Sequence, residues 1–138
     1  MLTATRKFSR PRVLLGDGHQ IILDTESQLL TPEFDIVGTV RDGAALLHAA
    51  DRLNPDVIVL DITMPNLNGL EVARQLKTRD SRAKIVFVSV HADPDLVREA
   101  LSIGASGYVV KHTMASDLLR AVRSVLEGEQ FISSGCSK

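Results

Sequence analysis

Five short apolar runs recur along the chain at regular spacing. Each run is continuously apolar and rich in β-branched residues, with no alternation between apolar and polar positions. Continuous apolarity of this length is typical of strands that are covered on both faces. The predicted strands are residues 13–15, 36–40, 57–60, 85–88 and 107–110.

The segments between these runs have the spacing of amphipathic helices, as Leu70, Ala73 and Leu76 illustrate. Pro94 after Asp93 is a typical helix start, with Asp93 as the cap. The predicted helices are residues 24–30, 42–52, 69–79, 94–103 and 115–127. Strand and helix alternate five times, which predicts a doubly wound (βα)5 fold of the α/β class, with a five-stranded parallel sheet and helices on both faces.

Length and composition indicate one domain. The chain has 138 residues, of which 44% are apolar, and we expect the domain at residues 12–130. Residues 1–11 are expected to be a disordered lead-in, and residues 131–138 a tail or the start of a linker. The single cysteine, Cys136, excludes an internal disulfide.

Charge and hydropathy exclude several partners. A net charge of -1 provides no basic excess for phosphates, which argues against nucleic-acid binding by this chain alone. No apolar run is long enough for a signal peptide or a membrane span, which predicts a cytoplasmic protein without a membrane partner.

Side chains suited to phosphoryl chemistry follow four of the predicted strands, where ligand sites of doubly wound sheets lie. They are Asp17, Asp61, Ser89 and Lys111. The two carboxylates could share Mg²⁺, and Asp61 could attack a phosphoryl donor while Lys111 and Ser89 hold the transferred oxygens. Taken singly, Asp17 before Gly18 is also typical of a tight turn, and Lys111 of a solvated lysine.

Two segments resemble the receiver domains of two-component response regulators. Residues 60–71, LDITMPNLNGLE, are similar to the receiver phosphorylation segment, in which the acceptor aspartate is followed by Met-Pro and a glycine. Residues 107–111 resemble the receiver fifth strand and its lysine, and Ser89 stands where receivers carry Ser or Thr. Residues 103–111, together with 128–133, are similar to receivers of the NarL/LuxR type.

The resemblance implies a flavodoxin-like sheet in the order 2-1-3-4-5 and a role in two-component signalling. Asp61 would accept a phosphoryl group from a sensor histidine kinase. Asp17, Asp61 and the backbone carbonyl of Thr63 would bind Mg²⁺. The expected role is that of a phosphoacceptor rather than an enzyme.

The resemblance also implies how the signal is passed on. Ser89 and Lys111 would bind the phosphoryl group, and Tyr108 would be the aromatic switch that alters a partner-binding face. A homodimer is possible, and DNA would be contacted only through a C-terminal helix-turn-helix domain outside these residues.

Gly18 departs from the family, because receivers usually carry a second acid at this position and that acid binds the metal directly. We therefore expect weak Mg²⁺ binding and slow phosphorylation. His112 replaces the proline that often follows the lysine, and the peptide bond before it is expected to be trans.

Two other functions stay open at this stage. A receiver-like module that binds partners without phosphorylation is favoured by Gly18. A metal-dependent phosphohydrolase is disfavoured, because such enzymes generally carry an acid two residues after the nucleophile, where this chain has Thr63.

Overall fold

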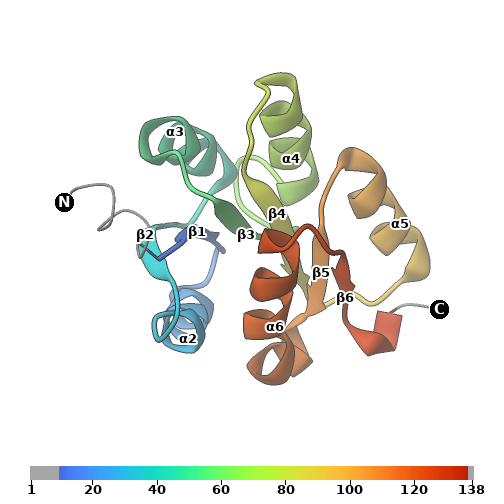
Figure 1. Ribbon diagram of the computed structural model, residues 1–138. Coiled ribbons are helices and arrows are strands. Elements are labelled where there is room, and N and C mark those ends of the chain that lie inside the picture. The colour runs from blue at the N-terminus through green and yellow to red at the C-terminus, as the bar shows by residue number, and fades with distance from the viewer. Residues whose placement is uncertain (1–9, 137–138) are drawn as a thin grey trace.

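The computed structural model describes residues 10–136, in which a parallel sheet is covered by helices on both faces (Figure 1). The strands are β1 (Arg12–Gly16), β2 (Asp35–Val40), β3 (Val57–Asp61), β4 (Lys84–Ser89), β5 (Gly107–Val110) and β6 (Phe131–Ile132). The helices are α2 (Gln20–Leu30), α3 (Gly43–Leu53), α4 (Gly69–Thr78), α5 (Pro94–Ile103), α6 (Met114–Leu126) and the short 3-10 turns η1 (Lys111–Thr113) and η2 (Ser134–Cys136). The doubly wound α/β prediction is confirmed.

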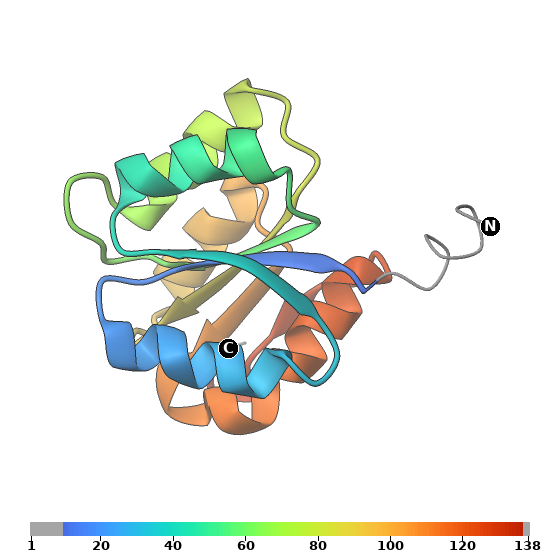
Figure 2. The ribbon, with the colours of Figure 1, turned by 90° about the vertical axis from the view of Figure 1, so that its left-hand side faces the viewer.

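The sheet separates two apolar cores, one on each face. Val13 and Leu15 of β1 pack on the side of α2 and α6, and Leu14 between them packs on the side of α3, α4 and α5. Figure 2 shows α3 and α4 on one side of the sheet and α2 and α6 on the other. Because both faces are buried, each strand must be apolar at successive positions, which explains the continuous runs in the sequence.

The sheet has one strand more than predicted in the residues that the structure describes. Its order is β2-β1-β3-β4-β5-β6, so the predicted order 2-1-3-4-5 is extended at one edge. Gly107 and Tyr108 of β5 pair in parallel with Phe131 and Ile132. A two-residue strand carries no periodicity, and the prediction of five strands was therefore incomplete.

The segment that contains β6 is packed as far as Cys136, which is free and buried. Of the segments predicted as lead-in and tail, residues 1–9 and 137–138 lie outside the described residues. No helix in residues 10–136 is both long and apolar enough to cross a membrane.

The start of α2 and the cap of α5 differ from the predictions. Helix α2 begins at Gln20 rather than at residue 24. Its first turn contains Ile21, 74% exposed, so the apolar run at residues 21–23 does not mark a single buried face. Asp93 does precede α5, but its side chain makes no capping hydrogen bond. Side-chain caps are instead made by Asp42 at α3 and Asn68 at α4.

Candidate functional site

The topology brings four predicted site residues to one edge of the sheet. Asp61 and Ser89 end β3 and β4, while Asp17 and Lys111 directly follow β1 and β5. Strand β3 lies between β1 and β4, and β5 lies beside β4, all in parallel. The carboxyl ends of these strands therefore meet, as the general rule for ligand sites in such sheets requires.

Lys111 is shared by the two carboxylates. Its Nζ lies 3.0 Å from Asp17 Oδ2 and 3.1 Å from Asp61 Oδ2. Asp17 is fully buried and Asp61 is 4% exposed. The ammonium offsets the repulsion that two buried carboxylates would otherwise exert on each other. These three side chains therefore form one charged cluster.

The charges in this cluster are not balanced. Burial, followed by the charge of Asp17, raises the pKa of Asp61 above its ordinary value, against the opposing effect of Lys111. Burial by itself would lower the pKa of Lys111, but the hydrogen bonds and charges of Asp17 and Asp61 raise it. The lysine is thus held as an ammonium, while negative charge is in excess. Such a site attracts a further cation.

The loop after β3 returns closely to the acceptor carboxylate. Gly69 N–H donates a hydrogen bond of 2.7 Å to the carbonyl of Ile62. A Cβ at position 69 would lie 2.3 Å from the carbonyl oxygen of Asp61, so only glycine fits. Thr63 N–H donates to Asp61 Oδ1 at 3.2 Å and orients the carboxylate. Metal binding by the Thr63 carbonyl stays a prediction.

Ser89 and Tyr108 meet at the start of the loop between β4 and α5. Ser89 Oγ accepts a hydrogen bond of 3.0 Å from His91 N–H, and Tyr108 Oη donates one of 2.8 Å to the His91 carbonyl. The Tyr108 side chain is fully buried, and burial raises its pKa. The hydroxyl and the aromatic residue predicted to form the switch are therefore linked through one backbone unit.

The oxygen donors at this edge fit a hard divalent cation such as Mg²⁺. Asp17 Oδ2 is buried and accepts no hydrogen bond, its ion pair with Lys111 aside. No set of three or more His, Cys, Asp or Glu side chains in residues 10–136 is arranged to hold a metal ion by itself. Backbone carbonyl and water oxygens would have to complete the coordination, as is usual for Mg²⁺.

The comparisons with known proteins agree with this arrangement. The family model described as "Response regulator receiver domain" matches residues 13–123. This chain belongs to that family. A curated relative, the transcriptional regulatory protein DegU of Brevibacillus brevis, is 36% identical over 123 residues, which are 88% of this chain and 52% of the relative. The nitrate/nitrite response regulator NarL of Escherichia coli (strain K12) is 35% identical, over 88% of this chain and 57% of NarL.

Solved receiver domains share the fold. The receiver domain of the response regulator NarL from Mycobacterium tuberculosis matches with a TM-score of 0.84 and 29% identity, over 88% of this chain and 99% of that one. A LuxR-family two-component response regulator from Aurantimonas sp. SI85-9A1 matches with a TM-score of 0.88 and 27% identity, over 94% of each chain. The chain is thus a receiver of the NarL/LuxR type, and it spans about half the length of the curated relatives.

Gly18 leaves the receiver site without an acid where the family usually has one. Its carbonyl accepts hydrogen bonds from Arg41 Nε and Nη2, at 3.2 and 3.0 Å. A Cβ at this position would lie 3.2 Å from Cδ of Pro65, which is tight but not prohibitive.

The peptide bond before His112 is trans, as predicted, since residues 10–136 contain no cis peptide.

A buried acidic residue that the sequence analysis did not single out is Glu26 of α2. It is 1% exposed, and burial, followed by the charge of Asp17, raises its pKa well above the ordinary value, with Lys111 opposing. Its position in the sequence does carry a signal, because it continues the stripe of buried residues at Leu23 and Leu30. A carboxyl group in an otherwise apolar stripe is unusual, because burying an acid without a partner is unfavourable.

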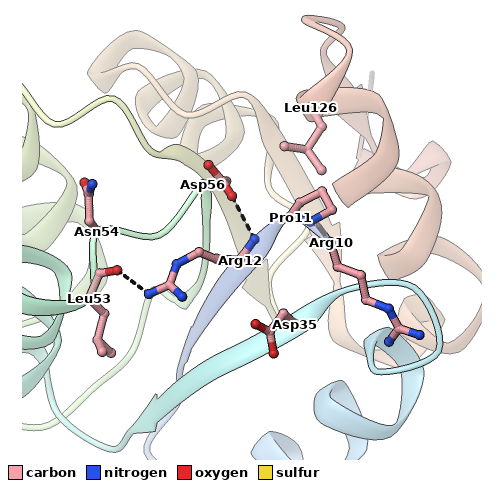
Figure 3. A pocket seen from close by; sticks show the side chains of 8 residues that line it. All are labelled: Arg10, Pro11, Arg12, Asp35, Leu53, Asn54, Asp56 and Leu126. Atoms are coloured by element: carbon pink, nitrogen blue, oxygen red, sulfur yellow. Dashed lines mark hydrogen bonds between the residues drawn. The ribbon is translucent and has the colours of Figure 1, made fainter. Parts of the chain in front are cut away.

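A pocket at the opposite end of the receiver sheet is a different feature (Figure 3). It lies where the first strands begin, and Arg12 crosses it. The Arg12 backbone N–H donates to Asp56 Oδ2 at 2.8 Å, and its Nη2 donates to the Leu53 carbonyl at 2.6 Å. Arg12 is thus hydrogen-bonded to Asp56 and Leu53, and no residue that lines the pocket is a predicted site residue. We therefore assign no phosphoryl chemistry to this pocket.

Proposed function

We propose that this receiver is a phosphorylation switch, with Asp61 as the acceptor and a sensor histidine kinase as the donor. The observation that supports this most directly is the position of Lys111 Nζ, within 3.1 Å of the buried Asp61 carboxylate. An ammonium held there can neutralise an oxygen of an incoming phosphoryl group without reorganisation.

In the proposed reaction, a carboxylate oxygen of Asp61 attacks the phosphorus of a phosphohistidine on the kinase. The O–P bond forms as the P–N bond breaks, and the histidine leaves with the bonding electron pair. Lys111 and the Ser89 hydroxyl bind the transferred oxygens. A divalent cation, held by Asp17, Asp61 and the Thr63 carbonyl, would neutralise further charge on them.

The phosphorylated receiver would signal through the face near Tyr108. Ser89 and Tyr108 both hydrogen-bond to the His91 backbone, so a movement of the Ser89 hydroxyl toward the phosphoryl group would change the surroundings of the ring. A homodimer or a C-terminal DNA-binding domain would read this change. The chain would act as a phosphoacceptor and not as an enzyme that turns over a separate substrate.

The test is chemical phosphorylation followed by intact-mass measurement. Incubation with acetyl phosphate and Mg²⁺ should add one phosphoryl group, which hydroxylamine should remove. Asp61→Asn should remain unmodified, and Asp24→Asn, a change of the same kind on the exposed side of α2, should be modified like the wild type. Equal labelling of wild type and Asp61→Asn would exclude Asp61 as the acceptor.

A second candidate is a receiver that binds its partner without phosphorylation. It is favoured by Gly18 and by the Tyr108 side chain, which is already buried and hydrogen-bonded in this structure. In that case, acetyl phosphate would not change the oligomeric state or the partner affinity, and Asp61→Asn would behave as the wild type in both measurements.

A further inference from the structure

On the edge that faces β6, the end of β5 is held by a side chain rather than by a strand. Strand β6 lies along this edge and pairs with Gly107 and Tyr108 (Figure 1). Beyond the end of β6, Ser133 Oγ accepts a hydrogen bond of 3.1 Å from the Val110 N–H, in place of a strand carbonyl. Ser133 is 2% exposed, so this bond is sheltered from water. The residue directly before Lys111 is therefore fixed by Ser133.

The same hydroxyl is connected to the turn that contains Lys111. Ser133 Oγ donates a hydrogen bond of 2.7 Å to Asp117 Oδ2 of α6, and Thr113 Oγ1 donates one of 2.8 Å to the same oxygen. Thr113 ends the turn η1, which begins at Lys111. The residue before Lys111 and the end of the turn after it are thus bound by two side chains that are hydrogen-bonded to each other. This network fixes the backbone that carries the ammonium.

The segment that provides Ser133 ends in a buried anchor. Cys136 is 2% exposed and packs in the same apolar core as Tyr108 and Val110. Its N–H and its Sγ both donate to the Ser133 carbonyl, at 3.1 and 3.2 Å. The Ser133 N–H donates to the Tyr108 carbonyl at 2.9 Å. Residues 131–136, the β6–η2 segment, are therefore closed onto β5 by backbone, hydroxyl and thiol contacts.

The position of the Lys111 ammonium matters for the proposed reaction. Its Nζ lies 3.0 Å from Asp17 Oδ2 and 3.1 Å from Asp61 Oδ2, and its side chain is 14% exposed. Stabilisation of a transferred oxygen requires a donor that is already in place, and a shift of ~1 Å can reduce a rate about a hundredfold. Opening of the β6–η2 segment would release Val110 and Thr113, and with them the backbone of Lys111.

We propose that Ser133 and Asp117 are positioning residues for Lys111, and that closure of the β6–η2 segment and phosphorylation of Asp61 favour each other. Coupling of this kind is reciprocal. If the closed segment stabilises the bound phosphoryl group, the phosphoryl group stabilises the closed segment by the same factor. The inference rests on the proposed function, because it assumes that Asp61 accepts a phosphoryl group.

Cys136 provides the readout, because it is the only cysteine of the chain and lies at the buried end of the β6–η2 segment. The full chain is partly phosphorylated with acetyl phosphate and Mg²⁺ and is then alkylated with N-ethylmaleimide. Intact-mass measurement resolves phosphorylated from unphosphorylated molecules in one sample and gives the alkylation rate of each. Cys136 should react at least about fivefold more slowly in the phosphorylated molecules, which is the lower end of the usual coupling between two sites.

Ser133→Ala tests the positioning role. Without the hydroxyl, phosphorylation by acetyl phosphate should slow at least about fivefold. The difference in Cys136 alkylation between phosphorylated and unphosphorylated molecules should also shrink, a change that a loss of stability by itself would not produce. Ser102→Ala, which removes an exposed hydroxyl from α5, is the matched control and should behave as the wild type in both measurements.

A second reporter distinguishes closure of this segment from tightening of the whole fold. In the double variant Cys136→Ser, Ala49→Cys, the thiol lies in α3 at a position that is 3% exposed, and its alkylation should not depend on phosphorylation. Equal protection at both positions, or Cys136 alkylation that is equal or faster in phosphorylated molecules, would overturn this inference alone. A wild type that gains no phosphoryl group on Asp61 would overturn the proposed function, and this inference with it.

Discussion

Gly18 is the position at which this chain lacks the second acid that receivers usually carry. Its backbone is not in the left-handed region, so a side chain can be placed there without conformational strain. Compared with receivers that carry an acid here, the chain therefore lacks one carboxylate beside Asp17 and Asp61, and its backbone is not strained. Gly18 is therefore compatible with the receiver fold, but it provides no carboxylate for a metal ion.

Gly18→Asp should raise Mg²⁺ affinity by about tenfold or more, equivalent to roughly 1.4 kcal/mol, by adding a charged oxygen ligand. Phosphorylation by acetyl phosphate should become faster at low Mg²⁺ concentrations. Calorimetric titration with MgCl₂ and the rate of mass gain test the two parts. Gly18→Asn, which has nearly the same shape but no charge, is the matched control. An affinity unchanged by the aspartate would contradict the prediction.

Gly69→Ala should destabilise the protein by about 1–3 kcal/mol, the usual cost of overpacking, because the added Cβ would meet the Asp61 carbonyl. It should also displace the acceptor and slow phosphorylation. Gly135→Ala is the control, since a Cβ at that position meets nothing within 4 Å. Urea unfolding of the two variants measures the difference, and similar midpoints would contradict it.

At the scale of elements, the short strand β6 joins the end of the receiver to the switch region. Ser133, which follows it, accepts a hydrogen bond of 3.1 Å from Val110 N–H, next to Lys111, and its N–H donates to the Tyr108 carbonyl at 2.9 Å. Its hydroxyl donates to Asp117 of α6 at 2.7 Å. Ser133 therefore ties the residue after β6 to Tyr108 and Val110 of β5 and to Asp117 of α6.

Asp117→Asn should weaken the attachment of β6, with an effect that depends on pH. Burial would raise the pKa of Asp117, but hydrogen bonds from Ser133, Thr113 and Ser116 lower it. A carboxyl group whose pKa is lowered by folding stabilises the fold above its unfolded-state pKa, and this stability is lost as pH falls through the folded-state value. The variant should thus be less stable than the wild type at pH 7, by about 1–3 kcal/mol. The difference should shrink below the ordinary carboxyl pKa.

Urea unfolding at pH 7 and at pH 3 provides the measurement. Asp95→Asn, at an exposed position in the first turn of α5, is the control and should show no such pH-dependent difference. A gap between Asp117→Asn and wild type that stays constant with pH would show that the charge of Asp117 does not matter.

At the scale of the whole molecule, the fold has to hold two like charges together at one edge. Asp17 and Asp61 are both buried, and Lys111 is the cation paired with them. The two apolar cores on either side of the sheet provide the stability that offsets this repulsion. Excess negative charge at this edge favours the binding of a cation.

Lys111→Met should destabilise the protein by about 3–5 kcal/mol at pH 8, because it leaves two buried carboxylates unpaired. The pKa of Asp61 is already raised in the native protein, and the loss of the ammonium should raise it further. A group whose pKa is raised by folding stabilises the fold at low pH, and that contribution is lost as pH rises through the folded-state value. The gap between variant and wild type should therefore widen with rising pH.

Urea unfolding at pH 5 and pH 8 tests this expectation, and Lys84→Met, at an exposed position in β4, is the matched control. A gap that narrows as pH rises would contradict the assignment of Lys111 as the counter-ion of the buried carboxylates.

The sequence by itself determined the α/β fold class and the residues at the strand ends, because buried parallel strands are continuously apolar and sheet topology aligns their ends. The strand order came from the resemblance to receivers and lacked β6. It also singled out Gly18, since a missing acid is visible within a motif. Only the tertiary structure decided that Phe131 and Ile132 form a sixth strand and that Glu26 of α2 is buried. Both depend on contacts between distant segments: a two-residue strand has no period, and a helical glutamate has no neighbours until the chain folds.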